Sequence, residues 1–79
     1  MMTDVKMVDV LVHIDEELGK DKREDVRDVV LKEAGVMAAA FHDDKPHLLN
    51  VEYDPDKVTS AALLKLVTDQ GCHAELIGL

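Results

Sequence analysis

Short apolar runs and helical patterns follow one another along this chain of 79 residues in an order that few folds accommodate. Residues 8–14 read Val-Asp-Val-Leu-Val-His-Ile, and this alternation predicts a strand with one buried face. The expected order is strand, helix, strand, strand, helix, strand, which is two β-α-β halves. The other expected strands are residues 36–42, 47–53 and 72–77.

Turn and capping residues mark the ends of the two expected helices. Asp21, with Glu24 three residues later, fits a capping box, and Gly35 fits the end of the first helix. Thr59 or Ser60 is expected to cap the second helix, which Gly71 ends. Residues 43–46 are expected to form the turn of a hairpin. The expected inward side chains of the helices are Val26, Val29, Val30, Ala34, Leu63, Leu64 and Val67.

This order predicts an α+β, ferredoxin-like βαββαβ sandwich, in which a four-stranded antiparallel sheet carries two helices on one face. In that topology the first and third strands are central, and the last strand flanks the first. The chain is short enough for one domain only, residues 1–79, with a thin core. Its hydrophobic content of 47% is that of a folded protein.

The charge of the chain limits its partners. It has 17 acidic and 9 basic residues, a formal net charge of −8. Nucleic acids and anionic membranes are therefore not expected as partners, because both require clustered Lys and Arg. No apolar run approaches the roughly 20 residues of a membrane span, and the N-terminus does not have the pattern of a signal peptide. We expect a cytoplasmic protein, and its one cysteine excludes an internal disulfide.

The framework resembles the heavy-metal-associated (HMA) domain, which is found in copper chaperones and metal-transporting ATPases. The resemblance covers nearly the whole chain. It rests on Gly35-Val36 at the second strand, on residues 51–55 (Val-Glu-Tyr-Asp-Pro) at the third, on Leu63, Val67 and Gly71 in and after the second helix, and on Ala74-Glu75-Leu76 at the end.

The chain departs from this family where the family binds its metal. The family's motif is Met-x-Cys-x-x-Cys between the first strand and the first helix. Here Ile14 matches the Met, and the two cysteine positions fall near Gly19 and Lys22. The segment 15–23 contains no cysteine and is about three residues longer than the family's loop. The family's thiolate metal transfer therefore cannot be carried over.

Two histidines and a carboxylate are the first candidates for a different metal site. In the expected topology His13 and His73 lie close together on the helix-free face of the sheet, with Glu75 beside them. Imidazole and carboxylate groups bind Zn²⁺, Ni²⁺ or Cu²⁺ when their geometry allows. The alternative is that all three are ordinary polar residues of an exposed sheet face.

Other candidates are weaker. His42 and His47 flank the expected turn, which also contains Asp43 and Asp44, and could face each other across the hairpin. Cys72 is expected to be a buried structural residue, because alternation turns it toward the helices. The acidic loops at residues 15–17 and 54–56 lack the spacing of a calcium loop. The sequence contains no catalytic motif, so we do not expect an enzyme.

Two functional interpretations remain. In the first, a non-enzymatic HMA-like module that has lost its thiolate site acts through protein contacts, with a protein partner or as a homodimer through the open sheet face. In the second, it binds or carries a transition metal through histidine. A thiol-dependent enzyme centred on Cys72 is the least favoured. The open face is expected to mix apolar and polar residues: Leu11, Ala38, Ala40, Leu48 and Ile77 beside Asp9, Asn50 and Glu52.

Overall fold

The computed structural model describes residues 6–77, and the expected order of elements is confirmed. The N-terminal residues 1–5, where no signal peptide is expected, lie outside the described part. Within that part, neither helix has the length and apolar character needed to cross a membrane. The elements are β1 (Val8–Ile14), α1 (Lys20–Leu31), β2 (Val36–His42), β3 (Lys45–Tyr53), α2 (Ser60–Thr68) and β4 (Ala74–Ile77).

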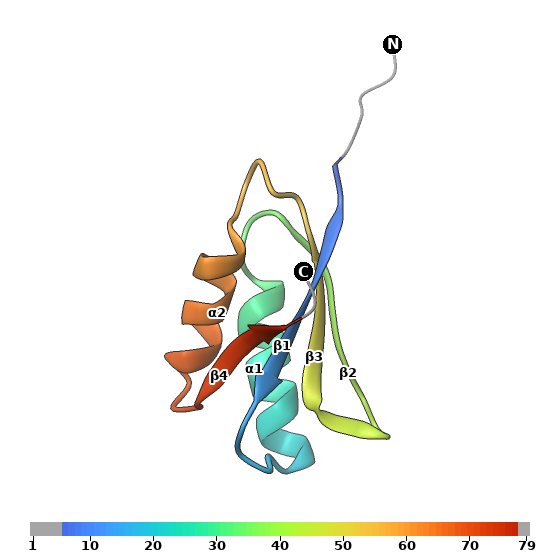
Figure 1. Cartoon of the computed structure of the whole chain (residues 1–79), viewed down its shortest axis with the longest axis vertical. Helices are drawn as coiled ribbons and strands as arrows, with labels where there is room; N and C mark the ends of the chain where they lie inside the picture. Colours follow the sequence, from blue (N-terminus) through green and yellow to red (C-terminus); the bar gives the residue numbers. More distant parts are fainter. Residues whose placement is uncertain (1–5, 78–79) are drawn as a thin grey trace.

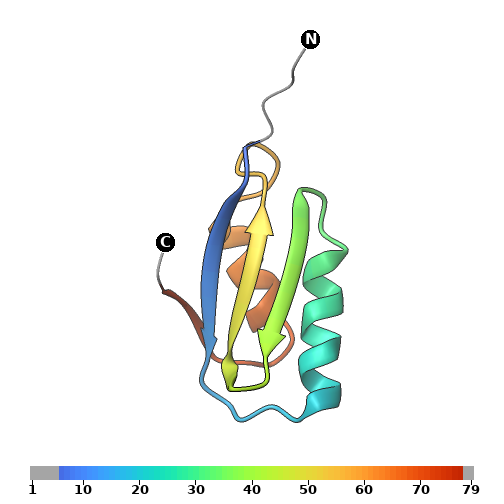
Figure 2. The ribbon, with the colours of Figure 1, turned by 90° about the vertical axis from the view of Figure 1, so that its right-hand side faces the viewer.

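The four strands form one antiparallel sheet in the order β2-β3-β1-β4, as the split β-α-β pattern predicts. β1 and β3 are central, and β4 flanks β1. Both helices lie on one side of the sheet (Figure 1). Figure 2 looks onto the opposite, helix-free side, where β1, β3 and β2 stand in front of α2. This open face of the sheet carries His13 and Glu75, two of the residues predicted as metal ligands.

Alternation along the strands builds the core. Val10, Val12 and Ile14 of β1 are fully buried, whereas Leu11 and His13 between them are only partly covered. Burying each such aliphatic side chain contributes roughly 1.5–3 kcal/mol. The helices add Val26, Val30, Leu63 and Val67, which are among their predicted inward residues. Among the described residues, the buried ones are all hydrophobic, so the core is apolar apart from the hydroxyl of Tyr53.

The first helix starts earlier and ends earlier than its sequence suggests. Gly19 is its N-cap and has no side-chain capping bond, so the capping box predicted at Asp21 is wrong. Asp21 lies in the first turn, where its carboxylate interacts favourably with the positive end of the helix dipole. The helix ends at Leu31, with Lys32 as C-cap, and the predicted inward Ala34 is exposed beyond it.

Two other boundaries also move. The hairpin turn contains only residues 43–44, because β3 already begins at Lys45. β4 begins at Ala74, two residues later than expected, so Cys72 and His73 precede the ladder. The predicted cap of α2 is confirmed at Thr59, whose Oγ1 accepts a hydrogen bond of 3.1 Å from the backbone N–H of Ala62.

We predict that Gly35→Ala destabilises the fold by about 2–4 kcal/mol. Gly35 has φ +96°, and a Cβ there would lie 2.7 Å from Cβ of Lys57 and 3.1 Å from Cγ1 of Val58. Gly71→Ala is the matched control, because Gly71 has φ +87° with nothing within 4 Å. It should cost only the backbone strain, about 1 kcal/mol. Urea unfolding of both variants measures the difference, and equal losses would show that the contact with Lys57 is unimportant.

Candidate metal centre

The pairing of β1 with β4 brings an imidazole and a carboxylate together on the open face. His13 lies opposite Glu75 in the antiparallel register, and Ile14 lies opposite Ala74. The backbone N–H of Asp15 donates a 2.8 Å hydrogen bond to the carbonyl oxygen of His73, which continues the same pairing past the end of β1. As a result, ligand atoms of His13, Asp15 and Glu75 all lie within 4.8 Å of one another.

The Nδ1 atom of the His13 imidazole has no hydrogen-bond partner among the described residues. Its Nδ1 lies 3.3 Å from Oδ1 of Asp15, but the atom is shielded from solvent and has no aligned hydrogen bond. A buried polar atom without a partner costs about 1–3 kcal/mol. Asp15 and Glu75 are exposed, so the group opens to solvent on its carboxylate side. An imidazole with two carboxylates can supply three ligands to a divalent ion and leave a position for water.

His73 does not join this group in the structure. Its Nδ1 lies 2.6 Å from Oε2 of Glu16, and its backbone N–H donates a 2.9 Å hydrogen bond to Oε1 of the same carboxylate. Its side chain is 84% exposed. The physical reason is that His73 precedes β4, so strand alternation does not fix the direction of its ring. The structure thus brings together two of the three predicted residues, His13 and Glu75, and adds Asp15.

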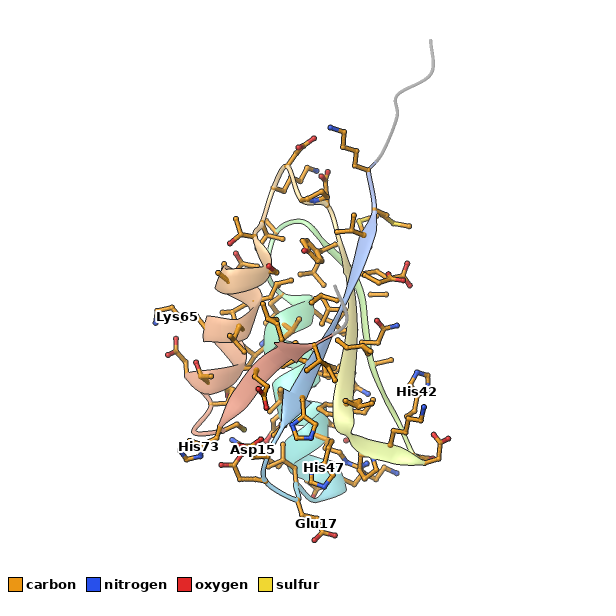
Figure 3. All side chains as sticks on the ribbon, viewed as in Figure 1. Asp15, Glu17, His42, His47, Lys65 and His73 are labelled. Carbon is orange, nitrogen blue, oxygen red and sulfur yellow. The ribbon has the colours of Figure 1, made fainter. Side chains whose placement is uncertain are left out.

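The Glu16–His73 contact shifts the pKa values of both residues in the directions that favour an ion pair. The hydrogen bond from His73 lowers the pKa of Glu16, and the same bond raises the pKa of His73. Because both groups are open to solvent, the pair ties the 15–19 loop to the start of β4 only weakly. It lies beside the metal candidate, with Asp15 and His73 at the same end of the molecule (Figure 3).

A second histidine, His47, stands against the His13 ring. The two ring centroids are 5.9 Å apart with an interplanar angle of 17°, a stacked arrangement. The Nδ1 of His47 lies 2.8 Å from the carbonyl oxygen of Ile14. Because a carbonyl oxygen only accepts, Nδ1 of His47 carries the proton. His42, predicted as a possible partner of His47, pairs with Lys45 in the register instead and lies apart from it (Figure 3).

Cys72 is a core residue, as predicted. It is free, 6% exposed and packed within the main apolar cluster. Burial raises the pKa of its thiol, the Glu16 carboxylate adds to this, and Lys22 opposes it. A hollow of about 430 Å³ lies over this region, lined by Asp15, Thr68, Cys72, His73, Ala74 and Glu75. Asp15 and Glu75 line this hollow, whereas His13 does not.

Comparisons with known proteins identify the fold but not the activity. The sequence matches no family model, and no curated protein matches it. Solved structures do match. A copper binding domain from HMA7, a P-type ATPase, has a TM-score of 0.81 at 18% identity, covering 89% of this chain and 93% of that one. Oxidized MerP from Ralstonia metallidurans CH34 has a TM-score of 0.80 at 17% identity, covering 90% and 97%.

A third match is the putative copper-ion-binding protein from Bacillus anthracis str. Ames. It has a TM-score of 0.81 at 15% identity and covers 91% of this chain and 100% of that one. The chain therefore has the ferredoxin-like fold of HMA domains, as the sequence predicts. Its only cysteine is Cys72, so the loop before α1 offers no thiolate.

We predict that His73 of the metal-free protein titrates above the ordinary histidine pKa of 6.5 and that Glu16→Gln removes most of this rise, leaving the smaller contribution of the Asp15 charge. The stability due to His73 is complete below 6.5 and is lost as pH rises through its raised folded pKa. The stability due to Glu16 is complete above its ordinary pKa of 4.5 and is lost as pH falls through its lowered folded pKa.

The difference in unfolding free energy between wild type and Glu16→Gln should therefore be largest between pH 4.5 and 6.5. NMR titration of the imidazole, with urea unfolding at several pH values, tests both statements. Identical His73 titration curves in the two proteins would show that the pair does not form in solution.

Proposed function

We propose that the chain is a non-enzymatic module that binds a divalent transition-metal ion through His13, Asp15 and Glu75. The observation that carries the proposal is that these three residues each place a ligand atom within 4.8 Å of the others. In addition, Nδ1 of His13 has no hydrogen-bond partner in the described part of the chain. A bound cation would satisfy that nitrogen and would offset the repulsion between the two carboxylates. The net charge of −8 also favours a cation as ligand.

The chemistry of the ligands selects the ion. Imidazole suits Zn²⁺, Ni²⁺ and Cu²⁺, and carboxylate oxygens suit harder divalent ions. A soft monovalent ion such as Cu(I) prefers thiolates. The one thiol, Cys72, is buried, and the pKa of its side chain is raised, which disfavours the thiolate form. We therefore propose that the thiolate site of HMA domains is lost here and that the new site has moved onto the sheet.

We predict that Zn²⁺ and Co²⁺ bind the wild-type protein at one site and that His13→Gln weakens this binding. Loss of an outer-shell partner typically reduces metal affinity about 10–100-fold, so loss of a ligand should reduce it at least as much. Asp15→Asn and Glu75→Gln should act in the same direction. Isothermal titration with Zn²⁺ and the visible spectrum of the Co²⁺ complex measure these effects.

His73→Gln is the matched control for this experiment. It removes a neighbouring imidazole that the structure pairs with Glu16, so Zn²⁺ affinity should stay close to that of wild type. Unchanged Zn²⁺ affinity in His13→Gln would contradict the proposed site. A tight stoichiometric Cu(I) complex that depends on Cys72 would contradict the loss of the thiolate site.

A second function, contact with another protein through the open face, is favoured by one apolar pair on that face. Leu11 and Ile77 lie opposite each other in the β1–β4 register, and Ile77 is 37% exposed. Both helices lie on the other side of the sheet (Figure 2), so neither helix covers this pair, of which Leu11 is half-buried. We propose that two copies of the chain form a homodimer through this face. We also propose that the protein is located in the cytoplasm, as the sequence predicts.

We predict that Ile77→Lys weakens this dimer by at least about tenfold, because it places a charge in an apolar contact. Leu31→Lys is the matched control, since Leu31 is 40% exposed on α1, away from the open face. Sedimentation equilibrium in the presence of a chelator measures both variants and wild type. A wild-type protein that stays monomeric at high concentration would exclude the homodimer.

A further inference from the structure

A second hollow lies on the opposite side of the molecule from the metal candidate, between α1 and the edge strand β2. Its volume is about 330 Å³. We call it the β2–α1 groove, and its lining residues are Lys20, Arg23, Glu24, Arg27, Ala39, Ala40, Phe41 and Asp43. In Figure 2, α1 stands beside β2 at the edge of the sheet. Three of the chain's nine Lys and Arg residues line this groove, in a protein of net charge −8.

The three cations come from one face of α1. Lys20, Arg23 and Arg27 are spaced by three and four residues, which places them in one row along a helix. Glu24 and Asp43 also line the groove, so cations outnumber carboxylates there by one. Elsewhere in the chain carboxylates are in excess. The groove is therefore a local inversion of the protein's charge.

Two of these cations have no acidic partner within the described residues. Lys20 and Arg23 form none of the ion pairs found there, whereas Arg27 binds Oδ1 of Asp28 through Nη2 at 3.1 Å. Nε of Arg23 is also shielded from solvent without a hydrogen-bond partner. A carboxylate from outside could still accept two parallel hydrogen bonds from the terminal Nη1 and Nη2 groups of this guanidinium.

The other wall of the groove is a free strand edge. β2 pairs with β3 on one side only, so alternate backbone N–H and C=O groups on its other side have no strand partner. Register shifts between Val36 and Ala38 and between Phe41 and His42 limit the regular edge to residues 38–41. Residues 38–40 are all alanine, so no long side chain stands along this edge; Ala39 is buried and Ala40 is exposed.

We propose that the β2–α1 groove binds an extended acidic segment of a partner protein. The segment adds as a further strand to residues 38–41 of β2, and its carboxylates pair with Arg23, Lys20 and Arg27. Main-chain hydrogen bonds supply affinity in this mode of recognition, and side-chain complementarity supplies specificity. The groove does not use His13, Asp15 or Glu75, so the inference stands independently of the metal site.

The test uses a terminally blocked peptide in which Glu alternates with Thr, titrated into ¹⁵N-labelled full-length protein. We expect shifts and slowed hydrogen exchange at the amides of residues 38–41. Arg23→Gln should lower the affinity by about tenfold, as loss of one hydrogen bond to a charged group does. Lys32→Gln, which makes the same change of charge outside the groove on the C-cap of α1, should bind like wild type.

Further arms decide among the alternatives. His13→Gln should bind the peptide as wild type does, because the metal candidate lies elsewhere. If a peptide in which Lys replaces Glu bound equally well, the proposed pairing of carboxylates with the cations of the groove would be wrong. Inorganic phosphate that shifts the Arg23 side-chain signal, with no peptide effect at residues 38–41, would overturn the docking surface and leave a small-anion hollow. No effect of the Glu peptide at millimolar concentration would likewise overturn the proposal.

Discussion

The rest of the structure depends on the placement of β1 between β3 and β4. One side of this strand contributes Val10, Val12 and Ile14 to the core, and the other side carries His13 to the open face. Since side chains alternate with a period of two, a slip of one residue would bury His13 and expose the valines. Burial of the apolar side chains of β1, which stabilises the fold, therefore also fixes His13 opposite Glu75. The strand pairing therefore places His13 and Glu75 close together before any ion binds.

In the proposed function, the metal ligands differ from the thiolates of HMA domains while the fold stays the same. In the loop before α1, residues 15–19, only Leu18 packs against the core, so the other positions of this loop are not fixed by the packing. Carboxylate and imidazole groups at the end of β1 and on β4 also lie outside the core. The buried Cys72 belongs to the packing and not to the site. The proposed ligands and the core residues are therefore different residues.

The sequence predicts the regular parts of this molecule better than the ends of its elements. Alternation predicted β1, and helical spacing predicted Val26 and Val30 as buried, because each pattern is repeated over several residues. The same alternation did not predict the position of the His73 side chain, since that residue precedes β4 and pairs with Glu16.

The sequence places Asp15 only in an acidic loop that lacks the spacing of a calcium loop, and does not group it with His13 and Glu75. Only the hydrogen bond from its backbone N–H to the carbonyl of His73 shows that strand pairing continues to it. That bond joins residues far apart in the chain, so no local pattern signals it. The stacking of His47 on His13 is likewise set by the β1–β3 register. Long-range pairing, more than local propensity, decides which polar groups meet at this end of the sheet.

The metal candidate and the β2–α1 groove differ in both charge and position, and this difference limits how they can influence each other. The metal candidate uses the β1–β4 side of the sheet, and the β2–α1 groove uses the other edge, with β3 between them. The first offers carboxylates to a cation, and the second offers cations to carboxylates. An acidic segment would be repelled by most of this protein and attracted only at the groove, so charge alone would orient it. A partner that docks along β2 would leave His13 and Glu75 accessible, and an ion could then enter or leave the site while the partner stays bound.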